Sequence, residues 1–161
     1  MARNEFDFGF VGGHLAGDEV DVHPWLTDEL VLIVGPAQAL ARKKSIKSEQ
    51  LRKEKFILRE SGSATRATIM SHLQQSNLAV ETIMEMENPE SVKKAVQSGL
   101  GIAFISRFAV ETELKAKSLV AVHVRGIDIR RELKIVYRKD KHLGRAAQTF
   151  ISIAQTNISQ K

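Results

Sequence analysis

The sequence predicts an α/β fold, and two features carry that prediction. Between residues 56 and 106, three short apolar segments typical of strands alternate with two segments that have the apolar periodicity of helices. The segments 30–34 and 102–105 are continuous apolar runs, as expected of strands buried on both faces. Strands that alternate with helices form parallel βαβ units, so we expect a sheet of that kind in the centre of the chain.

The chain begins with a short predicted strand and a loop. Residues 6–11 are rich in β-forming side chains, and a pair of glycines ends the segment. A loop that contains Pro24 is expected next, and it leads to the apolar strand at 30–34. A polar, basic segment then leads to a short helical turn at 48–51, where Ser48 is a candidate cap.

The central elements have clear end signals. Residues 64–76 are expected to form a helix between strands at 56–59 and 80–86, with Asn77 as a left-handed cap. The next helix has the clearest ends, because a residue that caps well precedes a proline at the first helical position and a glycine follows the last apolar residue. These three residues are Asn88, Pro89 and Gly99.

The last third of the chain completes the expected elements. The predicted order is a helix at 109–115, strands at 119–124 and 132–137, and a helix at 144–157. The final helix has a regular apolar stripe, with i, i+3, i+4, i+7 spacing. Its members are Ala147, Phe150, Ile151 and Ala154.

Composition and charge exclude several classes of protein. With 43% hydrophobic and 27% charged residues among 161, the chain has the composition of a soluble globular protein. No cysteine is present, which excludes disulfides, zinc–thiolate sites and cysteine nucleophiles. No segment resembles a membrane span or a secretory signal, so we expect a cytoplasmic location and no membrane partner. The net charge of +5 suits anionic ligands or solubility.

No pattern of catalytic or metal-binding residues is visible. The five histidines lack the i, i+4 spacing of a helical metal site, and only His14, after a strand end, lies where α/β proteins bind ligands. The segment 99–101 lacks the third glycine of a dinucleotide loop and follows a helix instead of a strand. Glu81 and Glu85 are expected on an exposed strand face. We therefore expect no catalytic residue, no metal and no cofactor.

The segment 59–66 is the candidate binding site. It leaves a strand, turns at a glycine and enters a helix, where the first backbone N–H groups have no intrahelical acceptor and favour an anion. Hydroxyl and guanidinium groups could add further donors. They belong to Ser61, Ser63, Thr65, Arg59 and Arg66. The alternative, that Ser61 or Ser63 only caps the helix, remains open.

Five stretches, taken together and in order, resemble a known family. They are residues 6–12, 28–34 with 39–41, 59–66, 87–103, and 131 with 133–136. This order is similar to the C-terminal effector-binding, or substrate-binding, domain of LysR-type transcriptional regulators, truncated on its N-terminal side. The segment 59–66 looks like that of the branch that regulates carbon fixation and sulfur or nitrogen assimilation, whose effectors are typically small anions or phosphorylated metabolites.

The resemblance implies a fold like that of type 2 periplasmic binding proteins, with two Rossmann-like lobes and the effector in the cleft between them. Residues 1–32 would be the remnant of an incomplete lobe I, and residues 33–125 would form lobe II. Residues 126–161 would form a return segment and a C-terminal helix that packs back toward lobe I.

The resemblance also implies site residues and partners. The effector would contact Ser61, Gly62, Ser63, Thr65 and Arg66 from lobe II, Gly12 and Gly13 from lobe I, and Glu87 and Ser91 near the cleft. The implied partners are a small anionic effector, further copies of the chain, and DNA only through a helix-turn-helix domain that this chain lacks. A solute-binding protein of the same fold and, less readily, a small α/β enzyme are the alternatives.

Overall fold

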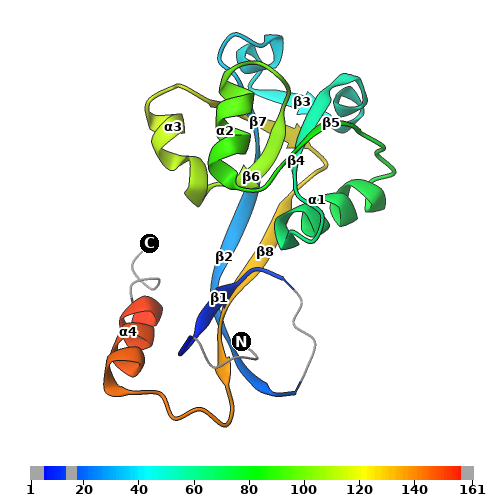
Figure 1. The fold of residues 1–161 in the computed structure, drawn as a ribbon. Coiled ribbons are helices and arrows are strands. Elements are labelled where there is room, and N and C mark those ends of the chain that lie inside the picture. The colour runs from blue at the N-terminus through cyan, green and yellow to red at the C-terminus, as the bar shows by residue number, and fades with distance from the viewer. Residues whose placement is uncertain (1–5, 14–17, 157–161) are drawn as a thin grey trace. The chain divides into compact units, whose positions relative to one another are not determined.

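The computed structural model describes residues 6–13 and 18–156, which belong to two compact units. Unit 1 comprises Met1–Thr27 with Arg131–Lys161, and unit 2 comprises Asp28–Arg130. The chain passes between the units within strands β2 (Val20–Val34) and β8 (Ile129–Arg138) (Figure 1). The boundaries differ from those expected at residues 32 and 125, and the assignment of the units to lobes I and II stays a prediction.

Strand β2 is the centre of unit 2. It pairs antiparallel with β6 (Ala103–Ser106) on one edge and with β7 (Val120–Arg125) on the other, so that Leu32 lies opposite both Phe104 and Val122. Strand β3 (Ser45–Lys47) then adds to β7 in parallel.

A parallel pair extends this arrangement beyond β6. Strands β4 (Lys55–Arg59) and β5 (Glu81–Met86) run parallel, and Phe56 in β4 forms a parallel bridge with Ile102. The sheet of unit 2 is therefore mixed, and the expectation of parallel pairing holds for the contacts of β4 with β5 and of β3 with β7. The pairings of β2 with β6 and β7 are antiparallel, so the parallel sheet expected in the centre of the chain does not extend to β2.

The two central helices begin and end where the sequence predicts. Helix α1 (Ala64–Gln75) is followed by Asn77 at φ 52°, and helix α2 (Pro89–Gln97) is followed by Gly99 at φ 76°. Asn88 Oδ1 accepts a hydrogen bond from Ser91 N at 2.9 Å, which caps α2.

Two apolar clusters form the core of unit 2, one on each face of β2. Side chains of a strand alternate between its faces, so Leu30 and Leu32 belong to one cluster and Val31 and Ile33 to the other. Helix α1 packs in the first cluster, and α2 and α3 (Glu111–Lys115) pack around the second, on opposite sides of the strands (Figure 1). This confirms that the apolar run in β2 is buried on both faces.

Helix α2, which packs around the second cluster, contains a buried lysine, Lys93. The Lys93 side chain is 8% exposed, and its Nζ donates to Ala109 O at 3.0 Å and to Glu113 Oε1 at 2.8 Å and lies 2.7 Å from Glu90 Oε1. Desolvation lowers the pKa of Lys93, but the hydrogen bonds to Glu113 and Glu90 outweigh it and raise the pKa above its ordinary value. Lys93 therefore ties α2 to the segment before and within α3.

Several elements differ from the sequence prediction. Residues 20–29, expected as a loop, belong to β2 in spite of Pro24. Among the described residues β6 and β7 pair with β2 only from Leu30 onward, so Pro24 interrupts neither of these ladders. The turn expected at 48–51 is a 3₁₀ helix, Ser48–Lys53, whose cap position is Lys47 and not Ser48. The 3₁₀ turn Ala39–Arg42 and strand β3 were not expected.

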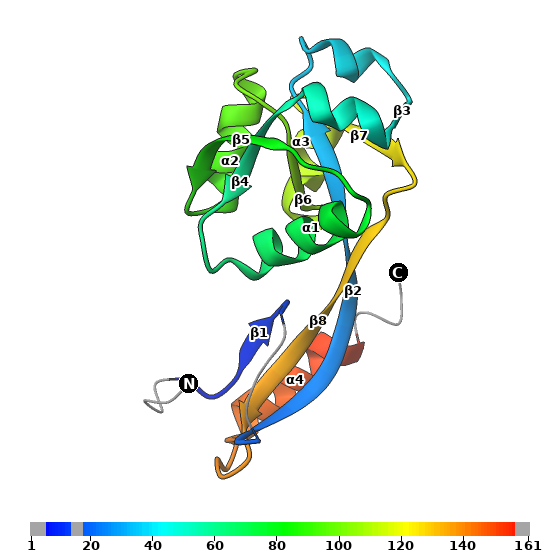
Figure 2. The same ribbon diagram turned by 90° about the vertical axis from the view of Figure 1, so that its right-hand side faces the viewer.

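Unit 1 consists of β1 (Gly9–Val11), the first part of β2, β8 and helix α4 (Arg145–Thr156) (Figure 2). Strand β1, shorter than the predicted 6–11, pairs antiparallel with β8. Trp25 Nε1 donates to Ala154 O at 3.0 Å, and the rings of Phe8 and Phe150 stack with centroids 5.4 Å apart. The apolar stripe predicted for α4 thus packs on the strands of unit 1, and residue 157 lies outside the described residues.

Within residues 6–13 and 18–156, no helix has the length and apolar character needed to cross a bilayer.

Gly101 provides a test of the packing of β4. A Cβ atom at this position would lie 2.6 Å from Lys55 O, at the point where Ile102 bridges β4. We expect Gly101→Ala to lower the free energy of unfolding by about 1–3 kcal/mol, because backbone would have to move. Urea denaturation measures this loss. The control Leu100→Ala, at an exposed neighbour, should change it by less than about 0.5 kcal/mol; equal losses would contradict the argument.

Candidate functional site

The order of strands in unit 2 creates a topological switch point at β4. Helix α1 connects β4 to its neighbour β5, and α2 connects β5 to the β6 segment on the other side of β4. The two helices pack in the clusters on opposite faces. In open α/β sheets, ligands bind at the carboxyl ends of the strands at such a point.

The segments that follow β4 and β5 lie next to each other at this edge. Glu60 N donates a hydrogen bond to Met86 O at 3.0 Å, and Arg59 Nη2 donates to Glu87 O at 2.9 Å. The structure thus brings the predicted segment 59–66 together with residues 87–91, and the starts of α1 and α2 flank the same site.

The start of α1 has the geometry of a capped helix. Gly62 adopts φ 91°, a conformation that favours glycine, and Ser63 N donates to Glu60 O at 3.2 Å to close the turn. Ser63 Oγ accepts a hydrogen bond of 3.4 Å from Arg66 N. Ser63 is therefore the cap, whereas Ser61 is exposed. Capping occupies one lone pair of Ser63 Oγ and leaves its hydroxyl hydrogen available to a ligand.

Both arginines of the segment contact carboxylates. Arg59 donates Nε and Nη2 to the two oxygens of Glu60 at 2.7 and 2.8 Å. Arg66 Nη1 lies 2.6 Å from Glu85 Oε1 and donates to Arg59 O at 3.0 Å. Their positive charge is partly neutralised, and an incoming anion competes with Glu85 for Arg66.

Glu85 is the site residue that sequence reasoning missed. The sequence indicated an exposed strand face, and the Glu85 side chain is indeed 49% exposed. Its pairing with Arg66 joins β5 to α1, and no local sequence signal identifies a partner so far along the chain.

The remaining predicted site residues contribute backbone groups or lie elsewhere. Glu87 is exposed, and its carbonyl accepts from Arg59. The Ser91 amide is bound by Asn88, so this residue helps to form the start of α2. Gly12 and Gly13 belong to unit 1, where a Cβ at Gly12 would approach Leu133 Cδ2 to 2.8 Å. Their place at an effector stays a prediction. His14 lies outside the described residues.

The arginines give the site its main electrostatic feature. The hydrogen bond from Arg59 lowers the pKa of the Glu60 carboxyl below its ordinary value, against desolvation, and the charges of Arg59 and Arg66 add to the effect. Glu60 is therefore ionised at neutral pH and holds the guanidinium of Arg59 in place. In the described part of the chain, no three side chains of the metal-binding types gather as ligands.

Comparison with known proteins identifies the family. The LysR substrate binding domain matches residues 1–159. The chain belongs to this family. The chain is 38% identical over 149 residues to the uncharacterized HTH-type transcriptional regulator YeiE of Escherichia coli K12. The match covers 90% of this chain and 49% of that protein. The chain is 34% identical over 150 residues to the RuBisCO operon transcriptional regulator of Allochromatium vinosum, covering 93% and 50%. The chain thus spans about half the length of these curated relatives.

Solved structures confirm the fold. The regulatory domain of CcmR from Synechocystis PCC6803, in complex with 2-PG, matches with a TM-score of 0.89 and 26% identity, covering 99% of this chain and 77% of that one. The effector-binding domain of QuiR in complex with shikimate matches with a TM-score of 0.83 over 97% of this chain and 73% of that one, and at 17% identity this shows the fold alone. The chain has the expected type 2 periplasmic-binding-protein-like fold. Its relatives are transcriptional regulators, as the resemblance implied.

The contact between Arg59 and Glu60 predicts a pH dependence. We expect Arg59→Gln to raise the pKa of Glu60 toward its ordinary value of 4.5, because the variant removes both the hydrogen bond and the charge. Titration of the Glu60 carboxyl carbon by NMR measures this. Since the folded-state pKa is lowered, the contact stabilises the fold above pH 4.5 and is lost as the pH falls through the folded-state value. Lys55→Gln, also on β4, is the control; an unchanged Glu60 titration in Arg59→Gln would contradict the assignment.

Proposed function

We propose that this chain is the effector-sensing domain of a cytoplasmic LysR-type transcriptional regulator and that its effector is a small anion, inorganic or phosphorylated, bound at the start of α1. The observation that carries the proposal is the switch point at β4, where the starts of two helices flank one site. The complex of the similar CcmR regulatory domain with 2-PG supports effector binding by this fold.

The first turn of α1 supplies the donors. The amide of Ala64, the first residue of the helix, has no intrahelical acceptor by its position, and the amides of this turn point along the positive end of the helix dipole. In the proposal, the hydroxyls of Ser61, Ser63 and Thr65 add to these amides. Gly62 lacks a Cβ, which lets the anion approach the backbone of the turn.

Arg66 supplies the charge by exchanging one partner for another. Its contact with Glu85 is partly exposed, and such pairs contribute only about 0–1 kcal/mol. An anion with more than one negative charge is a stronger partner for the guanidinium than Glu85. Breaking the pair therefore costs little, and binding would release Glu85 from α1.

The proposal leaves the other predicted residues with supporting roles. Glu87 and Ser91 shape the neighbouring start of α2 through their backbone groups. The contribution of Gly12 and Gly13 rests on the family resemblance alone. The chain spans about half the length of its curated relatives, so control of transcription by the whole protein is part of the proposal. A role as an enzyme has no support in the names of these relatives.

Anion titration of matched variants tests the site. Using phosphate and phosphoglycolate as probes in isothermal titration, we expect Ser61→Ala with Thr65→Val to weaken binding about tenfold, because two hydroxyl donors are lost. Ser63 is left intact, since its removal would also remove the cap of α1. We expect Glu85→Gln to tighten binding about two- to fivefold, because it removes the competitor for Arg66.

The control for the charge change is Glu81→Gln, on the same exposed face of β5. It should leave the affinity unchanged within twofold. If both glutamate variants changed the affinity equally, the effect would be one of net charge, and equal affinities for the double variant and the parent chain would place the anion elsewhere.

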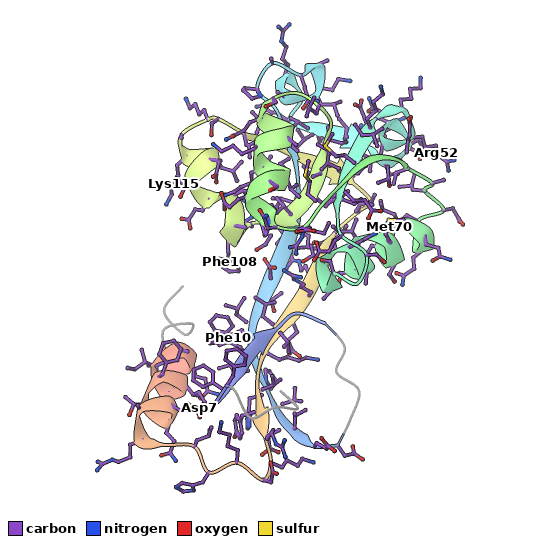
Figure 3. All side chains as sticks on the ribbon, viewed as in Figure 1. Asp7, Phe10, Arg52, Met70, Phe108 and Lys115 are labelled. Atoms are coloured by element: carbon purple, nitrogen blue, oxygen red, sulfur yellow. The ribbon has the colours of Figure 1, made fainter. Side chains whose placement is uncertain are left out.

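We also propose that the chain associates with copies of itself through unit 1. Large apolar side chains are exposed there, in and before β1 and on α4, and Figure 3 shows Phe10 beside α4. They are Phe6, Phe10, Phe150 and Ile153. Burying them in a shared interface removes apolar surface from water, and a stable interface of this kind covers more than roughly 1,000 Å².

Light scattering at micromolar concentration tests this association. We expect a mass at least twice 17.9 kDa, and a lower average mass for Ile153→Lys, which places a charge in the proposed interface. Phe108→Lys, at an equally exposed position on unit 2 (Figure 3), should leave the mass unchanged. A monomer that unfolds cooperatively would show that unit 1 closes its own core.

A further inference from the structure

Unit 2 contains a cavity of about 310 Å³ that includes none of the residues of the candidate site. It is lined by parts of β2, β6 and β7 and by the start of β8. The ladder between β2 and β7 ends at the pair Leu32 and Val122, and from His123 onward β7 pairs with β3. The cavity lies where β7 leaves β2.

Residues from both faces of the sheet line the cavity: Leu32 and Phe104 belong to the cluster that contains α1, and Val31 belongs to the other cluster. His123 is exposed, whereas its neighbours Val122 and Val124 are buried in the cluster that contains α1. Because side chains of a strand alternate, the imidazole of His123 points to the opposite face. The cavity shares no lining residue with the site at the start of α1.

Four nitrogen-bearing side chains from four separate segments line this cavity. They are Lys44, which precedes β3, Arg107, which follows β6, His123 in β7 and Arg130 in β8. All four are exposed. Ammonium, guanidinium and imidazole groups donate hydrogen bonds to an anion from different directions, and the first two add charge.

Two carboxylates also line the cavity, but each is already paired. Arg107 Nε lies 2.5 Å from Glu29 Oε2, and Arg130 Nε donates to Asp128 at 3.0 and 3.1 Å. Within the described residues the Lys44 and His123 side chains have no hydrogen bond or ion pair. These two donors are available to a ligand without displacing an internal partner.

Apolar side chains complete the lining. Val31, Leu32 and Phe104 are buried, and they border the cavity beside the charged groups. A volume of about 310 Å³ is at the lower end of the ~300–1,000 Å³ typical of small-molecule pockets. The cavity therefore suits a small molecule that has both an anionic group and a carbon skeleton.

We propose that this cavity is a second ligand site of the chain and that it takes a small phosphorylated metabolite. The phosphoryl oxygens accept hydrogen bonds from Lys44 and His123, and Arg107 and Arg130 add positive charge. A phosphoryl group matches these donors better than a single carboxylate, because it offers three acceptor oxygens and about two negative charges. The carbon skeleton packs on the apolar lining.

NMR of the full chain tests the proposal, with inorganic phosphate, pyrophosphate and glucose 6-phosphate as probes. We expect the ring signals of His123, assigned with His123→Gln, to shift and to saturate with pyrophosphate and glucose 6-phosphate. Ser61→Ala with Thr65→Val should leave these shifts unchanged, so that failure of the α1 site and failure of this cavity are distinguished. Absence of a saturable shift of His123 would overturn the proposal.

Matched lysine variants test the role of the cavity. We expect Lys44→Gln to weaken the binding that His123 reports about tenfold. Lys43→Gln, which removes the same charge at an exposed neighbour that does not line the cavity, should weaken it less than twofold. Equal effects of the two variants would indicate attraction by net charge and overturn the proposal. A shift of His123 by a short DNA duplex but not by pyrophosphate would overturn it as well.

Discussion

The structure of unit 2 depends on the burial of both faces of one strand. From Leu30 to Val34 the side chains of β2 are buried on alternate sides, and both apolar clusters of unit 2 contain them. Full burial of a side chain of this size contributes about 1.5–3 kcal/mol. A shift of β2 by one residue would exchange all of these side chains between the clusters, so its register is strongly determined. The strands on its two edges, β6 and β7, are placed by the same constraint.

This arrangement also explains where ligands can bind. Helix α1 packs on one face and α2 on the other, so the connection from β5 to the β6 segment passes over β4. The starts of both helices therefore lie at the carboxyl ends of β4 and β5. The second cavity lies beside the same central strand, where the ladder between β2 and β7 ends and β7 continues in its pairing with β3. Both proposed sites are consequences of how the neighbours of β2 are arranged.

The ion pairs of unit 2 divide into two kinds with different consequences. Lys93 is buried and has carboxylate partners in Glu90 and Glu113, so removal of Glu113 would leave a desolvated charge with weaker compensation. The contact of Arg66 with Glu85 is partly exposed, and its net contribution is small. The first kind holds helices together. The second kind is suited to exchange with a ligand, because little stability is lost when it opens.

Local interactions are the part of this protein that the sequence by itself determined. Ser63, Asn88 and Gly99 act within three or four residues of their own positions, so the ends of α1 and α2 could be predicted from the order of side chains alone. The ordered stretches along the chain likewise determined the family. Tertiary structure decided the rest. Pro24 lies in a strand at a point outside the ladders that β2 forms with β6 and β7, and Arg66 meets Glu85 because β5 lies beside β4. The side chains that line the second cavity are far apart in sequence, and only the pairing of strands brings them together. Local sequence does not determine that pairing, because it depends on the burial of all the apolar residues at once.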